Sequence, residues 1–198
     1  MTSPIVNIAV EGPSDLGVAR AVIRAAGLSP TEHPYVMNGK GNLDKRLPAF
    51  CNAAKLGPWL VLRDLDRAPC TGGLIAELAP RRPRLLIFRI AVRSVESWLL
   101  ADRSRIAEFL GVSPDLVPRE PDKDPAAKDL LVRLAARSRH REIREDMAPG
   151  LGSTARVGPN YPARLNAFAE EAWNPRVAAR SSPSLAGCLD ALRKLKRG

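Results

Sequence analysis

The sequence has few of the residues on which covalent and redox mechanisms depend. Only two histidines and three cysteines occur among 198 residues, and aromatic residues make up 5% of the chain. Cys51, Cys70 and Cys188 are too far apart for a zinc or redox pair, and their odd number argues against a disulfide framework. We therefore expect a protein of the reducing cytoplasm, stabilised by the apolar residues that form 45% of the chain.

The motifs of several large enzyme classes are also missing. No G-x-S-x-G, G-x-G-x-x-G or G-x-x-x-x-G-K-[ST] pattern occurs, so serine hydrolases, dinucleotide oxidoreductases and P-loop enzymes have no positive support. His33 and His140 have no cysteine partner at a catalytic spacing. The apolar stretches 85–92 and 98–101 are too short to cross a bilayer, and residues 4–10 lack the basic flank of a secretory leader. The sequence therefore predicts no membrane segment.

Positive charge is in excess and is clustered. The chain carries 31 lysine and arginine residues against 21 acidic residues, a formal net charge of +10. The main clusters lie within residues 81–84, 133–144 and 193–197. Such a balance attracts polyanions, so nucleic acid is the expected partner. The alternative is that the arginines only cover solvated helix faces, because a basic composition alone is a weak signal of nucleic-acid binding.

The first half of the chain alternates apolar strands with helices. Strands are predicted over residues 4–10, 33–37, 59–63 and 84–92, and helices over 15–27, 42–54, 72–79 and from residue 95 onward. Ser14 is predicted to cap the first helix, and Gly27 to end it. Alternation at this spacing predicts right-handed crossovers and a mostly parallel sheet that helices cover on both faces.

After residue 102 the pattern becomes helical. Helical spacing occurs over 103–110, 124–138, 162–171 and 183–195, whereas 112–125 and 148–162 are rich in proline and glycine. We therefore expect an α/β protein in which residues 1–102 form a catalytic core. Residues 103–198 are expected to form a helical extension packed on that core.

Three carboxylates follow predicted strands, where open parallel sheets form their binding sites. Glu11 follows the first strand, and Asp64 and Asp66 follow the strand over 59–63. Because alternate residues of an extended chain point to the same side, Asp64 and Asp66 should face one site, which Glu11 joins if the strands are neighbours. Oxygen ligands suit Mg²⁺ or Mn²⁺, which can activate water against a phosphate ester. The alternative is that these acids cap helices or pair separately with arginine, because Arg63 and Arg67 lie close by in the sequence.

Five further residues are candidates for the same site. Gly12 is expected to turn the backbone tightly after the first strand and to admit a phosphate. Asp15 is either a further metal ligand or a first-turn acid that favours the helix dipole. Lys40, in the loop NGKGN, either binds phosphate at a helix start or lies in an ordinary turn. Glu96 is a further catalytic carboxylate or a first-turn acid, and Lys128 either reaches phosphate or lies on a solvated helix face.

These motifs resemble a known family. A strand that ends in Glu-Gly (VEGPSD) and a later strand that ends in Asp-x-Asp (VLRDLD) are similar to the Toprim domain of topoisomerases, primases and the overcoming-lysogenisation-defect (OLD) nucleases. More narrowly, AVRSVESWLLAD, the loop around Lys40 and RSSPSLAGCLDAL resemble a family of small bacterial Toprim-like proteins of unknown function. Members of that family often occur near defence genes or ATPases. The Toprim motifs lie within residues 5–100, and the narrower likeness covers nearly the whole chain.

The resemblance implies a Toprim-like (Rossmann-like) sheet and roles for individual residues. It implies Glu11 as a metal ligand or general acid/base, Asp64 and Asp66 as Mg²⁺ ligands, and Glu96 as a fourth catalytic carboxylate. The sequence has no topoisomerase tyrosine domain and no primase zinc region. We therefore expect a metal-dependent nuclease, in bacterial defence, that acts alone or with an ATPase partner. Two alternatives remain: a non-catalytic protein that binds nucleic acid or docks on an ATPase, and a phosphatase of small phosphate esters.

Overall fold

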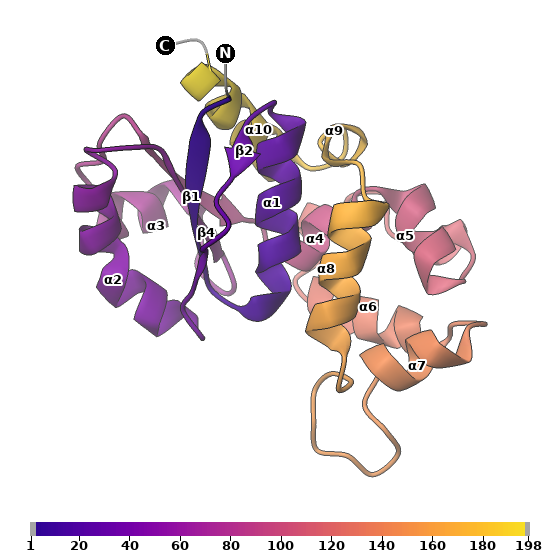
Figure 1. Cartoon of the computed structure of the whole chain (residues 1–198). Coiled ribbons are helices and arrows are strands. Elements are labelled where there is room, and N and C mark those ends of the chain that lie inside the picture. Colours follow the sequence, from indigo (N-terminus) through magenta and orange to yellow (C-terminus); the bar gives the residue numbers. More distant parts are fainter. Residues whose placement is uncertain (1–2, 197–198) are drawn as a thin grey trace.

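The computed structural model describes residues 3–196, in which strands and helices alternate along the first half of the chain (Figure 1). The strands are β1 (Ile5–Val10), β2 (Ser29–Pro30), β3 (Tyr35–Val36), β4 (Trp59–Asp64) and β5 (Leu86–Ala91). Within these residues they form a five-stranded sheet of order β2-β1-β4-β5, with β3 also beside β1. Each strand pairing is parallel, which confirms the predicted sheet.

The register of the central strands brings their carboxyl ends to the same edge. β1 and β4 pair as far as Val10 opposite Leu62, and β4 pairs with β5 along its whole length. Both central strands are rich in buried apolar residues, as expected where helices cover both faces of a parallel sheet. Glu11 and Asp64 consequently lie where neighbouring strands end, as the sequence predicted.

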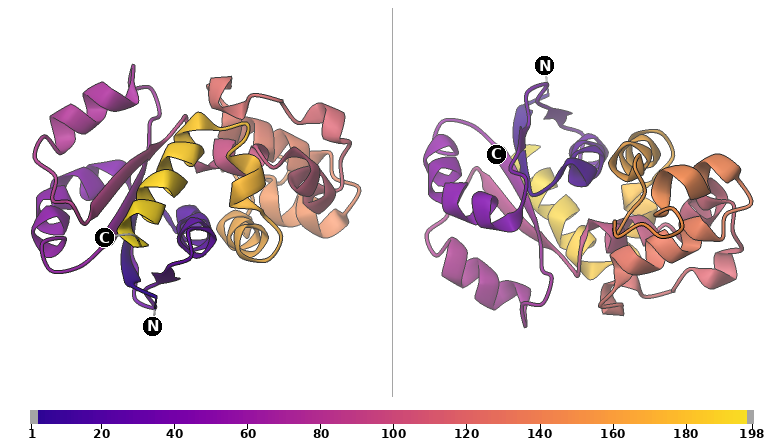
Figure 2. Two further views of the ribbon diagram at one scale, coloured as in Figure 1. Left: turned by 90° about the horizontal axis from the view of Figure 1, so that it is seen from above. Right: turned by 90° about the horizontal axis from the view of Figure 1, so that it is seen from below.

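Helices cover both faces of this sheet (Figure 2). One face packs against α2 (Lys40–Ala53) and α3 (Thr71–Leu78), whose apolar side chains meet the alternate residues of β4 and β5 that face them. The other face packs against α1 (Leu16–Ala25) and α10 (Pro183–Lys196). The last helix of the chain therefore returns to the sheet, where α10 contacts both β5 and α1.

A group of further helices lies beside the sheet, beyond α1 (Figures 1 and 2). They are α4 (Val95–Leu100), α5 (Arg103–Leu110), α6 (Ala127–Ala136), α7 (Arg141–Met147), α8 (Tyr161–Glu171) and α9 (Pro175–Ala178). The contact of α8 with α1 needs Gly17, because a side chain there would collide with the backbone of Asn166. Asn166 in turn accepts a hydrogen bond from the Gly17 N–H (2.8 Å) and donates to the Pro13 carbonyl (2.9 Å).

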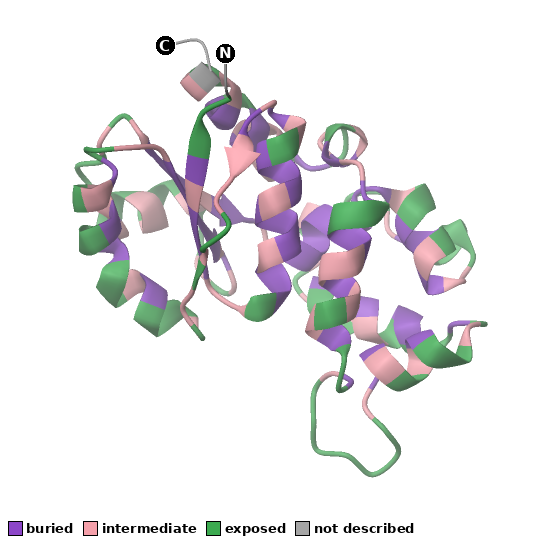
Figure 3. Ribbon diagram, in the orientation of Figure 1, coloured by how far each residue is buried: buried purple, intermediate pink, exposed green. Residues whose placement is uncertain are grey.

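One apolar core joins the sheet to these helices. It runs from β1 and α1 through the completely buried Trp98 of α4 to Phe168 of α8. Figure 3 shows buried residues both in the sheet and in the helices beyond α1, while the segment between α7 and α8 is mostly exposed. The helices are therefore fixed against the sheet, and a site between them has walls of defined position.

The structure corrects several sequence expectations. The first helix follows a 3₁₀ turn, η1 (Pro13–Asp15), so Ser14 does not cap it, and its hydroxyl donates to Asp15 instead (3.0 Å). α2 begins at Lys40 rather than at residue 42. The short elements β2, α7 and α9 were not predicted, and neither were the 3₁₀ turns η2 (Pro114–Leu116) and η3 (Pro121–Lys123), because segments of this length carry little periodicity.

The structure also shows the state of the three cysteines and the length of the apolar helices. The three cysteines are free: Cys188 is buried in α10, Cys51 is partly buried, and the exposed Cys70 accepts a hydrogen bond from the Gly73 N–H (3.3 Å). In the part of the chain that the structure describes, no helix is both long and apolar enough to cross a membrane.

Candidate active site

A cleft of about 720 Å³ lies between the carboxyl edge of the sheet and the helical half of the chain. The sheet side contributes acidic and basic residues that follow β1, β4 and β5, together with the start of α2. The helical side contributes the first turn of α6 and the end of the segment between α7 and α8. The lining residues are Glu11, Lys40, Asp64, Asp66, Arg67, Arg93, Ser94, Pro125, Ala126, Ala127, Lys128, Asp129, Arg156 and Val157.

The three carboxylates predicted from strand ends all line this cleft. Glu11 and Asp64 do so because β1 and β4 are neighbours in the sheet. Asp64 accepts a hydrogen bond from the Val95 N–H at the start of α4 (3.0 Å), which fixes its carboxylate. One carboxylate oxygen of Glu11 is buried and has no hydrogen-bond partner among the described residues.

Asp66 reaches the cleft by a different route from the predicted one. Its φ of 52° places it in the left-handed region, so the chain turns after the strand instead of continuing in extended form. Two hydrogen bonds hold the turn, from the Leu65 N–H to Ala91 and from the Asp66 N–H to Arg93. The Asp66 carboxylate forms an ion pair with the Lys40 ammonium group (2.7 Å), which positions Lys40 at the site.

The neighbouring arginines form no ion pair with Glu11 or Asp64 among the described residues. Arg63 forms a two-point ion pair with Asp44 of α2, at 2.8 Å and 3.0 Å, on the other side of β4. Arg67 lines the cleft without a hydrogen bond or ion pair to any described residue. Arg63 and Arg67 therefore form no ion pair with Asp64 or Glu11, whereas the contact of Asp64 with the Val95 N–H at the start of α4 fits the alternative of a helix-capping acid.

Asp15 belongs to the same acidic region, whereas Gly12 does not play the expected part. Asp15 is 5% exposed and accepts hydrogen bonds from the Gly12 N–H (2.7 Å) and the Ser14 hydroxyl. Gly12 has φ −136°, an extended conformation open to any residue, and a side chain there would meet only ordinary contacts. The chain does turn here, since the Asp15 N–H donates to the Gly12 carbonyl oxygen (3.2 Å), but the turn does not require glycine. Its N–H group is used by Asp15, and Gly12 does not line the cleft.

Glu96 lies behind these residues and is contacted from the helical half. It is 1% exposed, and one of its carboxylate oxygens accepts a hydrogen bond from the Tyr161 hydroxyl of α8 (3.1 Å). The Lys128 ammonium group of α6 lies 3.8 Å from the same oxygen and 5.6 Å from the centre of the Tyr161 ring. The other carboxylate oxygen of Glu96 is buried without a partner in the described residues. Sequence reasoning missed Tyr161.

Burial and mutual repulsion disfavour the charged forms of these carboxylates. Burial, followed by the charge of Glu96, raises the pKa of Asp15 to about 7. Burial, followed by the charges of Asp15 and Glu96, raises the pKa of Asp64 well above its ordinary value. Burial and the charge of Asp66 raise the pKa of Glu11. Positive charge brought among these groups would lower all three pKa values.

The carboxylates of this region are suitable ligands for a divalent cation, although they do not form a complete coordination shell. Among residues 3–196 no three His, Cys, Asp or Glu side chains form a ready-made metal cluster. The donors are all carboxylate oxygens, which Mg²⁺ and Mn²⁺ prefer, and Mg²⁺ usually keeps several waters. The unpartnered oxygens of Glu11 and Glu96 are costly to bury unless a cation or a proton satisfies them. An ion held partly through water would agree both with the lack of a ready-made cluster and with the unpartnered carboxylate oxygens.

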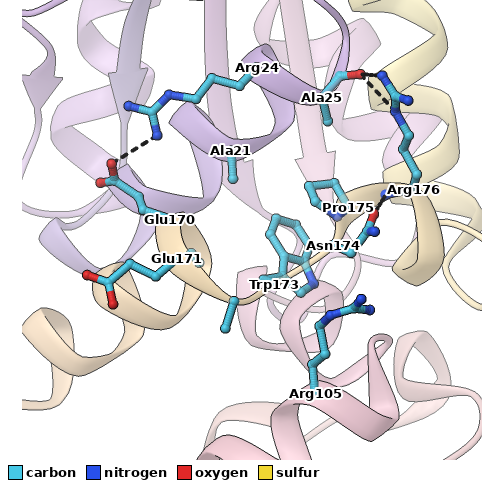
Figure 4. Close-up of a pocket in the computed structure, with 12 residues that line it drawn as sticks. Ala21, Arg24, Ala25, Arg105, Glu170, Glu171, Trp173, Asn174, Pro175 and Arg176 are labelled. Carbon is cyan, nitrogen blue, oxygen red and sulfur yellow. Dashed lines mark hydrogen bonds and ion pairs between the residues drawn. The ribbon is translucent and has the colours of Figure 1, made fainter.

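A second hollow, of about 540 Å³, lies where α1, α5, α8 and α9 meet (Figure 4). Apart from Glu171, its charged side chains are engaged with one another or with the backbone. Arg24 pairs with Glu170 (3.1 Å), and Arg105 pairs with the buried Asp102 (3.3 Å). Arg176 donates twice to a carbonyl oxygen at the end of α1, at 3.2 Å and 2.8 Å.

Comparisons with known proteins give a limited result. No protein-family model matches the sequence, and no curated protein matches it. Among solved structures, the C-terminal region of the Burkholderia pseudomallei OLD protein is similar at 18% identity and a TM-score of 0.48, over 98% of this chain and 99% of that one. The C-terminal region of the Xanthomonas campestris pv. campestris OLD protein is similar at 16% identity and a TM-score of 0.44, over 96% and 95%.

Proposed function

We propose that this protein is a nuclease that hydrolyses phosphodiesters with a divalent metal ion, Mg²⁺ or Mn²⁺. The observation that carries the proposal is the arrangement of charge in one cleft. Glu11, Asp64 and Asp66 form its acidic floor, where one oxygen of Glu11 has no partner, and lysine and arginine side chains form its rim. The floor suits a cation, and the rim suits the phosphates that the cation would act on.

Individual residues take defined parts in this proposal. Glu11, Asp15, Asp64 and Asp66 would hold the ion, which when bound polarises the phosphate and lowers the pKa of water. Hydrolysis joins the oxygen of water to phosphorus and breaks one bond from phosphorus to an ester oxygen. The proton that water loses passes to a carboxylate: Glu11 lines the cleft with an unpartnered oxygen, Glu96 lies behind it, and solvent protonates the leaving oxygen.

The lysines orient the substrate and complete the charge balance. Lys40 begins α2, where backbone N–H groups and its ammonium group can both meet a phosphate oxygen. Lys128 lies at the start of α6 on the opposite wall of the cleft. Nucleic acid, an ATPase partner and a place in bacterial defence belong to the proposal through the Toprim-like motifs of the sequence, because the site itself identifies only phosphate chemistry.

A substrate panel tests the proposal directly. Plasmid, single-stranded DNA, tRNA and nucleotides are each incubated with the purified protein in Mg²⁺, in Mn²⁺ and in EDTA. We expect cleavage of nucleic acid in metal only, and its loss in an Asp64→Ala/Asp66→Ala variant that keeps the circular-dichroism spectrum of the wild type. Wild-type cleavage rates in that double variant would overturn the assignment.

A non-catalytic nucleic-acid-binding protein is the second candidate. The ion pair between Lys40 and Asp66 (2.7 Å) favours it, because this pair neutralises one carboxylate without any metal. This candidate predicts binding of nucleic acid with no turnover in any divalent metal. The third alternative, a phosphatase, predicts turnover of nucleotides alone, so the same panel separates all three.

A further inference from the structure

The rim of the cleft contains two arginines that the chemistry at its floor does not use. Lys40 and Lys128 lie beside Asp66 and Glu96, respectively. Arg93 donates to the carbonyl oxygens of Asp66 and Ala68, at 3.4 Å and 3.3 Å, and so holds the turn that follows β4. Two guanidinium groups therefore remain for another task.

These two groups are Arg67 and Arg156, and they come from opposite walls. Both are exposed, both line the cleft, and neither forms a hydrogen bond or ion pair within residues 3–196. Arg67 directly follows the turn at Asp66, on the sheet side. Arg156 belongs to the segment between α7 and α8, on the helical side (Figure 1). An arginine that faces a cleft without an acidic partner has all of its donors free for phosphate oxygens.

The segment that carries Arg156 is anchored at its base. Asn160 donates to the Asp146 carboxylate (2.7 Å) and Arg164 donates to its other oxygen (2.6 Å). Gly158 passes so close to the Asp146 carbonyl that no side chain would fit there. The rest of the segment is exposed, and Figure 3 shows it extending away from the helices. The anchored base holds Arg156 at the cleft, two residues from Gly158.

We propose that Arg67 and Arg156 bind the backbone phosphates on either side of the phosphodiester that is cut. The first turn of α6 lines the same wall as Arg156, so its backbone N–H groups add to the positive potential there. The site then takes an internal position in a polynucleotide strand, rather than a terminal phosphate or an isolated phosphate ester. This inference rests on the proposed nuclease function and specifies its substrate class.

Two substrates that differ only in their flanking phosphates test the inference. One is a 12-nucleotide single strand, and the other is bis(p-nitrophenyl) phosphate, a diester without neighbouring phosphates. The Arg67→Gln/Arg156→Gln variant is compared with an Arg119→Gln/Arg180→Gln variant, which removes two exposed arginines that neither line the cleft nor belong to a basic cluster. We expect the ratio of kcat/KM for the strand to that for the small diester to fall about tenfold in the first variant only.

Binding of the same strand in EDTA gives a second measurement that needs no turnover. The slope of log Kd against log salt should become shallower by about 1.4 when two phosphate contacts to a single strand are lost, and should not change in the control variant. An unchanged slope in the Arg67→Gln/Arg156→Gln variant would overturn the inference, and so would equal losses on both substrates. If the wild-type protein hydrolyses neither substrate, the nuclease proposal fails, and the salt slope still decides whether the two arginines bind the strand.

Discussion

The two hollows of this protein contain similar charged residues, but most of these residues are paired in one hollow and several are unpaired in the other. The hollow between α1, α5, α8 and α9 has arginines and glutamates that pair with each other or with the backbone. The cleft at the carboxyl edge of the sheet has carboxylates that repel one another and arginines with no acidic partner. Charge compensation is thus internal in the first region and incomplete in the second.

This difference indicates which region is built for a ligand. In the first region the principal unpartnered group is the indole N–H of Trp173, which is 6% exposed. In the second, one carboxylate oxygen of Glu11 is buried without a partner, as is one of Glu96 behind the cleft, and these acids repel Asp15 and Asp64. A fold tolerates such repulsion where a cation completes the site, because otherwise the carboxylates must take up protons. The cleft, not the hollow of Figure 4, is therefore the functional candidate.

Of the substitutions that compare the two regions, Glu11→Gln should have the largest effect on cleavage and on metal affinity. The change removes a negative charge from the cleft with almost no change in shape, so it weakens cation binding and the activation of water. We expect cleavage to fall by about 10²–10³-fold, together with a loss of Mn²⁺ affinity measured by calorimetry. Glu171→Gln, in the other hollow, is the matched control and should leave both quantities within about twofold. Equal losses in the two variants would remove the distinction between the regions.

The pH dependence of the unfolding free energy should also show that the carboxylates of the cleft repel one another. The pKa of Asp15 is about 7 in the folded protein against an ordinary value of 3.8, so the folded state binds its proton more tightly than the unfolded state. The resulting stability is complete at low pH and is lost as the pH rises through about 7. We expect the unfolding free energy in EDTA to fall by on the order of a few kcal/mol between about pH 4 and pH 7.

Added Mg²⁺ should reduce this fall, because an ion that binds only the folded state stabilises it. Thermal melts across the pH range, with and without Mg²⁺, measure both effects. The Asp15→Asn variant keeps the hydrogen bond from the Gly12 N–H and should show a flatter curve in EDTA. A wild-type curve that is already flat would mean that Asp15 is not held near Asp64 and Glu96.

The sequence predicted the position of part of the cleft because strand order determines it. Glu11 and Asp64 each follow a buried strand, and the carboxyl ends of adjacent parallel strands meet at one edge. For Asp66 the prediction gave the right place for a wrong reason. An extended chain was expected, but the left-handed turn at Asp66 depends on hydrogen bonds to residues that follow β5.

The residues of the helical half could not be found in this way. Tyr161 reaches Glu96 only because α8 packs along α1, and Gly17 and Asn166 determine that contact. Arg156 comes to the cleft through a long irregular segment, for which periodicity gives no information. Such contacts depend on tertiary packing between distant elements, so a single sequence carries no local signal for them.

Lys40→Gln should have two smaller effects of opposite direction: the affinity for metal should rise and cleavage should fall. The ammonium group of Lys40 competes with a metal ion for Asp66, and the pair is partly exposed. Its removal should raise Mn²⁺ affinity by about 1.4- to 5-fold, the range of an exposed ion pair. Cleavage should nevertheless fall, because a phosphate contact is lost. Calorimetry and strand cleavage on the same variant measure the two effects, and a fall in both would show that Lys40 supports the metal site instead of competing with it.

Arg24→Gln should have the smallest effect, and an effect on stability alone. It breaks the ion pair with Glu170 (3.1 Å) in the second hollow, while Arg20 remains as a weaker partner at 3.4 Å. Because these side chains are partly exposed, we expect a loss of about 0.2–1 kcal/mol, which lowers the melting temperature by about 0.4–4 °C in a chain of this size. Cleavage and Mn²⁺ affinity should stay at wild-type values. A larger effect on cleavage than on melting would mean that the second hollow communicates with the cleft through α1, which packs against both the sheet and α8.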